Sequence, residues 1–120
     1  MFTPGLVSVT FRPLGRLEIT DWMQKCGLTA VEWGGDVHVP AKDPSAIADA
    51  VTVSREHGIE IVSYGSYYRA GVTTEETTAA FSDELAATVA LGAPNIRIWA
   101  GTKGSAAATK EERKAFTDDI

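Results

Sequence analysis

Residues 43–64, DPSAIADAVTVSREHGIEIVSY, contain one helix and the strand that follows it, and they decide the fold. Asp43 is a typical N-cap residue and Pro44 suits the first helical position, so a helix is predicted to begin there. Ile47, Ala50, Val51 and Ser54 then recur at helical spacing before Gly58, which is typical of a helix end. The β-branched run Ile59–Tyr64 predicts a strand directly afterwards.

Further strands are predicted on both sides of this unit. They share short runs of β-branched or aromatic residues and lie at Leu6–Phe11, Ala30–Trp33 and Asn95–Ala100. With Ile59–Tyr64 they make four strands, each separated from the next by a segment of helical periodicity.

The other predicted helices are recognised by their apolar stripes and caps. The first places Ile19, Trp22, Met23 and Cys26 on one stripe before Gly27. The third begins with the capping-box pair Thr73 and Glu76 and carries Phe81, Leu85 and Val89 on one face before Gly92. The fourth begins with the pair Thr109 and Glu112, and Phe116 and Ile120 start its stripe.

The resulting order is β-α-β-α-β-α-β-α, which predicts an α/β fold with a parallel sheet and right-handed crossovers. Four units in 120 residues average 30 residues each, which is the spacing of a (β/α)8 barrel at half its length. We therefore expect residues 1–120 to form the N-terminal half of such a barrel, with the last helix cut short. The alternative is an open doubly wound sheet, but the first turn, Arg12-Pro13-Leu14-Gly15, lacks the glycine pattern of a dinucleotide site.

Composition excludes several classes of protein. The hydrophobic fraction of 44% and the charged fraction of 22% are those of a globular domain, and the net charge of −5 argues against nucleic-acid binding. The single cysteine, Cys26, permits no intrachain disulfide. No run of about 18 apolar residues occurs, so we expect a soluble, cytoplasmic protein with no membrane partner.

Polar and aromatic side chains gather at the predicted strand ends, where parallel α/β folds bind ligands. Alternation along Asn95–Ala100 places Arg97 and Trp99 on one face of the sheet, and alternation in the second strand places Glu32 on the same inner face. Glu32 and Arg97 could then meet. They would form either a buried structural ion pair or a direct contact to a ligand.

The two histidines receive different interpretations. His38 follows a Gly-Gly-Asp loop, where it is a candidate for proton transfer or metal ligation; the alternatives are a solvated histidine and one bonded to Asp36. His57 precedes Gly58 at a helix end, where a cation complements the helix dipole, so we predict a structural role for it.

Aromatic residues near the strand ends are candidates for a pocket. Tyr64 and Trp99 could line it together with Trp33, because aromatic faces stack on the apolar side of sugar rings. Core filling is the alternative for each of them. Tyr67 and Tyr68 lie in a predicted loop, and the direction of their side chains is left open.

Residues 31–40 (VEWGGDVHVP) and 95–101 (NIRIWAG) together resemble the sugar phosphate isomerase/epimerase family of xylose isomerase-like TIM barrels. The segment Glu56–Ile59 (EHGI) adds to this resemblance, which covers nearly the whole chain but only the N-terminal half of the family. It implies substrate contacts from the ends of strands two to four, by Trp33, His38, Tyr64, Arg97 and Trp99. Of these, His38 is the candidate catalytic residue.

The resemblance also implies a divalent metal ion that assists proton transfer next to a carbonyl. Its ligands in the family, two glutamates, an aspartate and a histidine, come from strands five to eight. Those strands have no counterpart in residues 1–120, so no ligand is assigned.

Two functions of different classes follow. The first is the front half of a metal-dependent isomerase or epimerase that acts on a small sugar, sugar phosphate or polyol. The second is a half-barrel binding module without chemistry of its own, which pairs with another chain. Both predict unpaired edges at Leu6–Phe11 and Asn95–Ala100, and therefore a homo-oligomer or a fragment of a longer chain.

Overall fold

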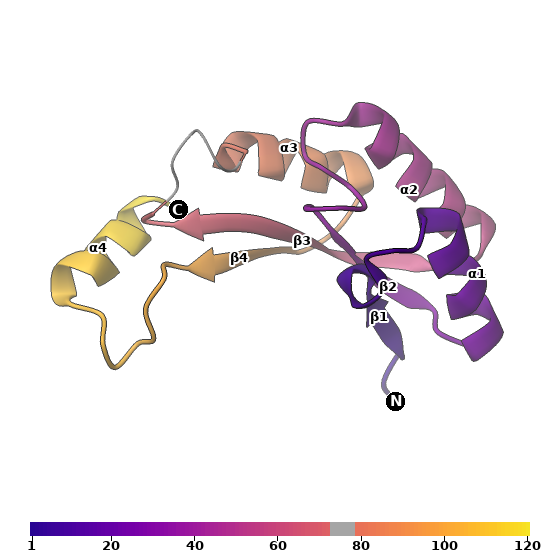
Figure 1. The fold of residues 1–120 in the computed structure, drawn as a ribbon, viewed down its shortest axis with the longest axis horizontal. Coiled ribbons are helices and arrows are strands. Elements are labelled where there is room, and N and C mark those ends of the chain that lie inside the picture. Colours follow the sequence, from indigo (N-terminus) through magenta and orange to yellow (C-terminus); the bar gives the residue numbers. More distant parts are fainter. Residues whose placement is uncertain (73–78) are drawn as a thin grey trace.

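The computed structural model describes residues 1–72 and 79–120 (Figure 1). Its four strands form one sheet in the order β1-β2-β3-β4, and every neighbouring pair is parallel. The strands are β1 (Gly5–Val7), β2 (Ala30–Gly34), β3 (Glu60–Ala70) and β4 (Ile96–Ala100). The helices are a short 3-10 helix η1 (Ser8–Phe11), α1 (Arg16–Cys26), α2 (Pro44–Glu56), α3 (Phe81–Leu91) and α4 (Lys110–Asp118).

The strand order distinguishes the two predicted architectures. In a doubly wound sheet the order reverses at a switch point and helices cover both faces. Here the order follows the sequence, and Figure 1 shows α1, α2 and α3 side by side along one face of the sheet. The prediction of four parallel β/α units that form part of a barrel is therefore confirmed.

The first strand is shorter than predicted. It ends at Val7, and residues Ser8–Phe11 form η1 instead of continuing the strand. Ser8 is completely buried, and its hydroxyl accepts a hydrogen bond of 2.9 Å from the amide of Gly34 at the end of β2. This contact between two strand ends is tertiary, which is why the β-branched run of residues 6–11 predicted too long a strand.

The third strand is longer than predicted. Residues Tyr67 and Tyr68, predicted in a loop, belong to β3, which runs to Ala70. The pairing of β3 with β4 shifts register between Gly65 and Arg69, so β3 carries a bulge where its partner does not.

Only half of the apolar stripe predicted for α1 is buried. Ile19 and Met23 are buried as expected, whereas Trp22 is 55% exposed and Cys26 is also exposed. The ring of Trp22 lies under the ammonium group of Lys25 instead of in the core.

The predicted face of α3 is wrong. Leu85 and Val89 are 45% and 71% exposed. The residues that α3 buries are smaller or polar: Glu84, Ala87, Thr88 and Leu91. The helix begins at Phe81 after Ala80, and the predicted capping pair at positions 73 and 76 lies outside the described residues.

The caps predicted for α2 and α4 are confirmed. The carboxylate of Asp43 accepts a hydrogen bond of 2.9 Å from the amide of Ala46, with Pro44 at the first helical position. Thr109 and Glu112 exchange both bonds of a capping box at the start of α4. Of the apolar pair predicted on α4, Phe116 is partly buried and Ile120 is exposed.

The hydrophobic core lies between the sheet and helices α1, α2 and α3. Val31 and Trp33 of β2 and Tyr64 of β3 contribute to it from the sheet, and Ile19 and Leu91 contribute from helices. The core therefore occupies one face of the sheet. Among residues 1–72 and 79–120, no helix has the length and apolarity needed to span a membrane.

Candidate functional site

An ion pair crosses the face of the sheet that the helices leave uncovered. Arg97 of β4 donates from Nε to Oε1 of Glu32 in β2 over 2.9 Å. Strand β3 lies between these two strands, and the residue beneath the pair is Gly65. A Cβ at this position would lie 2.7 Å from Arg97 Nη2 and 2.8 Å from Glu32 Oε1. The predicted meeting of Glu32 and Arg97 is confirmed, and it depends on a glycine in the strand between them.

The ion pair with Glu32 leaves the terminal nitrogens of Arg97 available as hydrogen-bond donors. Glu32 and Arg97 side chains are 15% and 35% exposed, so neither is fully removed from water. Within the described part of the chain, the terminal nitrogens of Arg97 have no hydrogen-bond partner and are not buried. Arg97 can therefore keep Glu32 and still donate to another acceptor.

Trp99 contacts two arginines on the same face of the sheet. The guanidinium carbon of Arg97 is 5.5 Å from the centre of the Trp99 ring, and that of Arg69 is 5.2 Å from it. Arg69 is the β3 residue directly opposite Trp99 in the sheet register. Trp99 remains 40% exposed, so the prediction that it points away from the helix-covered core is confirmed.

A second polar group is formed by the loops after β1 and β2. Arg12 donates to the hydroxyl of Tyr67 over 2.6 Å and forms an ion pair with Asp36. The guanidinium also lies 5.9 Å from the centre of the Tyr67 ring. Tyr67 therefore fixes an arginine at the carboxyl end of the sheet.

Trp33 and Tyr64 lie on the helix-covered face. Both are completely buried; the indole nitrogen of Trp33 donates to Ser54 of α2 over 3.0 Å, and the hydroxyl of Tyr64 donates to the carbonyl of Val39 over 2.9 Å. Burial raises the pKa of Tyr64. These contacts correspond to the core-filling alternative, and the substrate-binding roles of Trp33 and Tyr64 stay predictions.

His38 is 3% exposed and lies beside the ring of Trp33, with 6.1 Å between ring centres. Its Nε2 is 3.1 Å from the carbonyl of Leu14, which requires a proton on Nε2. Its Nδ1 has no partner among the described residues. Burial lowers the pKa of His38. A catalytic role for His38 stays a prediction, and in this arrangement the imidazole is buried beside Trp33.

His57 has the predicted structural position. Its Nδ1 lies 2.8 Å from the carbonyl of Val53 and its Nε2 lies 2.9 Å from the carboxylate of Asp21. Two acceptors favour the doubly protonated ring, and the pKa of His57 is raised, chiefly by the Val53 carbonyl and then by Asp21.

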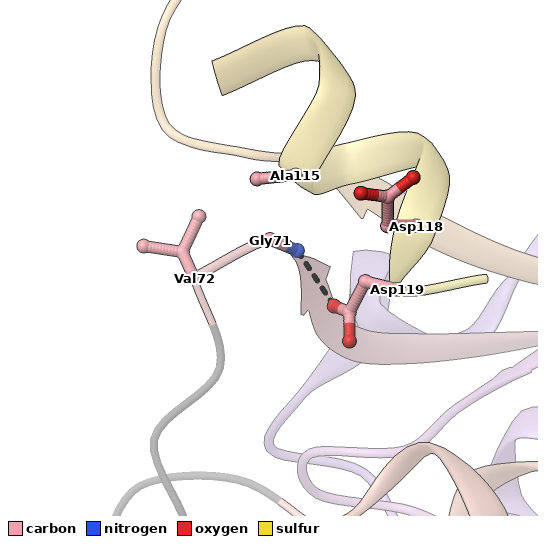
Figure 2. A pocket seen from close by; sticks show the side chains of 5 residues that line it. All are labelled: Gly71, Val72, Ala115, Asp118 and Asp119. Atoms are coloured by element: carbon pink, nitrogen blue, oxygen red, sulfur yellow. Dashed lines mark hydrogen bonds between the residues drawn. The ribbon is translucent and has the colours of Figure 1, made fainter. Parts of the chain in front are cut away.

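Two hollows of the described chain lie elsewhere, around α4. Figure 2 shows one of about 510 Å³, lined by Gly71 and Val72 after β3 and by Ala115, Asp118 and Asp119 of the α4 region. Its acidic groups are engaged: Asp119 accepts from the amide of Gly71 over 2.6 Å, and Asp118 pairs with Lys114. No residue predicted for the site lines this hollow.

The described residues do not fit a metal ion by themselves. No group of three or more histidine, cysteine, aspartate or glutamate side chains lies close enough to hold one in residues 1–72 and 79–120. Glu32 and Asp36, the acidic residues near the candidate site, are each engaged by an arginine.

Sequence reasoning missed four residues of interest. Arg69 and Arg12 were passed over because one lay in a predicted loop and the other in a turn. Gly65 could have been found from the sequence, because it directly follows the predicted strand that lies between the strands of Glu32 and Arg97. Glu84, a buried carboxyl group of α3 whose pKa is raised by burial, was placed off the buried face by the wrong stripe.

These features define a class of protein. Sequential parallel β/α units, helices on one face and charged residues at the carboxyl end of the uncovered face are the arrangement of a (β/α)8 barrel, of which four units are present. More particularly, the fold is that of about half of a xylose isomerase-like TIM barrel, as solved structures show.

Three of those structures come from bacteria. A xylose isomerase domain-containing protein from Salmonella typhimurium LT2 is 15% identical, with a TM-score of 0.70 over 94% of this chain and 42% of its own. AsbF from Bacillus anthracis, described as a 3-DHS dehydratase involved in petrobactin synthesis, is 17% identical, with a TM-score of 0.68 over 98% and 45%. A proposed xylose isomerase from Rhodospirillum rubrum ATCC 11170 is 17% identical, with a TM-score of 0.69 over 98% and 46%.

The chain thus spans less than half of the length of the structures that it matches. No protein-family model matches the sequence, and no curated protein matches it. At 15–17% identity the likeness concerns the fold alone.

Proposed function

We propose that residues 1–120 form the first half of a sugar or sugar phosphate isomerase or epimerase and supply part of its substrate pocket. The observation that carries this proposal is the position of Arg97: it lies on the uncovered face, level with the carboxyl end of β2 in the sheet register, and Glu32 holds it across Gly65. Ligands of (β/α)8 barrels bind at this end. Two of the matching structures are named for xylose isomerase, which supports the reaction class.

The chemistry assigned to this chain is binding and orientation. Arg97 donates hydrogen bonds to a hydroxyl, carbonyl or anionic oxygen of the substrate, and Glu32 limits the rotamers from which it can do so. A preorganised donor loses less conformational entropy on binding than a free arginine. No group of side chains able to hold a metal ion lies among residues 1–72 and 79–120, so we assign no metal ligand to these described residues.

Arg97→Ala in the full-length protein tests the proposal. Five-carbon aldoses, ketoses and their phosphates are the ligands, calorimetry measures binding, and NMR in D2O measures exchange of the proton next to the carbonyl. We expect Arg97→Ala to lower affinity by about tenfold or more, since a charge-assisted hydrogen bond is lost. Arg55→Ala, which changes an exposed arginine of α2, is the matched control.

Circular dichroism must show that both variants are folded. A folded Arg97→Ala protein with unchanged affinity and exchange would contradict the pocket assignment. Failure of the unaltered protein to bind any of these compounds or to exchange the proton would contradict the reaction class.

The second candidate function is a non-catalytic half-barrel that pairs with another chain. The uncovered face of the sheet favours it, because Val7 and Trp99 are about two-fifths exposed there. If a tightly bound protein partner copurifies and proton exchange is absent with and without it, this candidate replaces the first.

A further inference from the structure

We propose that Glu84 is a carboxylic acid, not a carboxylate, in the folded protein, and that its proton holds the loop between β2 and α2 in place through the hydroxyl of Tyr64. The loop comprises residues 35–43 and follows the carboxyl end of β2. It is therefore expected to loosen as the pH rises. The inference concerns the helix-covered face of the sheet and does not rest on the proposed function.

The first observation is the burial of the carboxyl group. Glu84 belongs to the buried residues of α3, which packs against β3, and it is 4% exposed. Its Oε2 atom is buried without a hydrogen-bond partner in the described part of the chain. A buried carboxylate with an unpaired oxygen is far less stable than a buried acid, so these surroundings favour the protonated form. Burial raises the pKa of Glu84; a hydrogen bond from Tyr64 opposes this increase and the charge of Asp83 adds to it.

The second observation is that Tyr64 has one proton for two neighbouring oxygen groups. Its hydroxyl donates to the carbonyl of Val39 over 2.9 Å. The same hydroxyl forms a hydrogen bond with the carboxyl group of Glu84. While the proton of Tyr64 points to Val39, this second hydrogen bond needs a proton from Glu84. The geometry therefore fits two successive donations, from Glu84 to Tyr64 and from Tyr64 to Val39.

The third observation is how closely the loop packs on this hydroxyl. Val39 is completely buried, and a Cβ at Gly35 would lie 2.5 Å from Oη of Tyr64. When Glu84 ionises, its carboxylate becomes the stronger acceptor and draws the proton of Tyr64 away from Val39. The Val39 carbonyl then loses this hydrogen bond in the protein interior, which destabilises the conformation of the loop. Ionisation of Glu84 is thus coupled to the loop that carries His38.

The other charged and titratable groups on the described elements around Glu84 have partners of their own or are exposed. Asp83, beside Glu84 on α3, pairs with Lys42 of the loop over 3.2 Å. Tyr68 of β3 donates to Asp119. The remaining groups are His38 in the loop, Asp49, Arg55 and Glu56 of α2, and Glu60, Tyr67 and Arg69 of β3. Tyr64 is therefore the group through which Glu84 reaches the loop.

The protonation state of Glu84 is tested by NMR of protein that carries an isotope label at the glutamate carboxyl carbons. The signal that is absent from Glu84→Gln belongs to Glu84. We expect this signal to keep its acid position above pH 4.5, the ordinary pKa of a glutamate carboxyl. Glu111→Gln, which changes an exposed glutamate of α4, is the matched control and should leave the signal in place.

Urea midpoints at several pH values give a second readout. Because the pKa is raised in the folded state, the contribution of Glu84 is complete below pH 4.5 and is lost as the pH rises through the folded value. Glutamine is neutral throughout and can still donate to Tyr64. Glu84→Gln should therefore gain stability relative to the unaltered protein as the pH rises, whereas Glu111→Gln should not.

Hydrogen exchange of the loop amides tests the coupling. The amide of Val39 donates to Gly34 and that of Asp43 donates to Pro40. At a pH where Glu84 is ionised, we expect these two amides to be about tenfold less protected in the unaltered protein than in Glu84→Gln, since a buried hydrogen bond is lost. Tyr64→Phe, which keeps the ring and removes the hydroxyl, should lower their protection at every pH, and adding Glu84→Gln should not restore it.

Each contrary result has a distinct meaning. A Glu84 signal that titrates at or below pH 4.5 would overturn the acid form and the whole proposal. A raised titration together with equal loop protection in the unaltered protein and Glu84→Gln would overturn the coupling to the loop. Neither result bears on the proposed function, which depends on the uncovered face of the sheet.

Discussion

Gly65 determines whether the Glu32–Arg97 pair can exist. In Gly65→Ala the added methyl group would lie under 3 Å from both side chains, so the pair must shift or separate. We expect a loss of about 1 to 2 kcal/mol in the free energy of unfolding, measured by urea denaturation. The contacting atoms are the far ends of flexible side chains, which keeps the cost from being larger.

A double variant, Glu32→Ala with Arg97→Ala, provides the control for this prediction. Without the two long side chains, an alanine at position 65 should cost little or even stabilise the strand, because glycine is unfavourable in a strand interior. An equal cost in both backgrounds would show that Gly65 serves some purpose other than the ion pair.

His38 and His57 should give opposite dependences of stability on pH. Burial lowers the pKa of His38 below its ordinary value of 6.5, so the unfolded chain takes up the proton first as the pH falls. The contribution of His38 is therefore complete above pH 6.5 and is lost as the pH falls through the lower pKa of the folded state. His57, with its raised pKa, contributes fully below pH 6.5 and loses its contribution as the pH rises through the folded value.

Urea midpoints measured at several pH values test this prediction. Compared with the unaltered protein, His38→Gln should flatten the curve below pH 6.5, and His57→Gln should flatten it above. If His38→Gln leaves the acid side unchanged, burial does not lower the pKa of His38 in the folded protein.

At the residue scale, the sequence predicted the face of the sheet on which a side chain lies wherever alternation along a strand decides it. The period of two along β4 placed Arg97 and Trp99 correctly, and the same rule brought Glu32 to the same face. The state of His38 was not predictable, because it depends on the carbonyl of Leu14, twenty-four positions away in the sequence. Distant backbone contacts of this kind leave no local pattern.

At the scale of single elements, α3 provides a clear test. Because Val89 is 71% exposed, Val89→Gln should change the free energy of unfolding by no more than about 0.5 kcal/mol. Ala87 is buried against the core, and Ala87→Leu should cost about 1 to 3 kcal/mol through overpacking. Thermal unfolding of both variants measures the difference. A marked loss in Val89→Gln would mean that another part of the protein covers this face.

The start of α2 provides a second test. Asp43 accepts a hydrogen bond from the amide of Ala46, so Asp43→Ala should cost about 1 kcal/mol, while Asp43→Asn should retain most of the stability. Urea denaturation distinguishes the two variants. Equal stability of Asp43→Ala and the unaltered protein would contradict the cap.

The elements themselves were predictable to different degrees for physical reasons. Helix α2 carries both a side-chain cap and an apolar stripe, and its bounds were found. The buried face of helix α3 carries the small residues Ala87 and Thr88, which give little hydrophobic contrast, so the larger Leu85 and Val89 indicated the wrong face. Strand β1 ended early because a contact between Ser8 and Gly34 took precedence over β propensity.

At the scale of the whole molecule, the uncovered face of the sheet is the dominant feature. Helices α1, α2 and α3 bury one face, while the other carries Val7, Trp99 and the arginines. Strands β1 and β4 are the two ends of the strand order, so each has one side without a neighbour in the described sheet. Exposed edges of this kind favour association with further strands.

Light scattering on the 120-residue chain tests this consequence. We expect a dimer or a larger assembly at micromolar concentration, because pairing at β1 and β4 would supply neighbours for both edges and cover the exposed face. Val7→Lys, which places a charge on the exposed part of β1, should shift the assembly toward monomer, whereas Val89→Lys on the outside of α3 should not. A monomer that unfolds cooperatively would contradict the prediction and show that four β/α units are stable with one face of the sheet open to water.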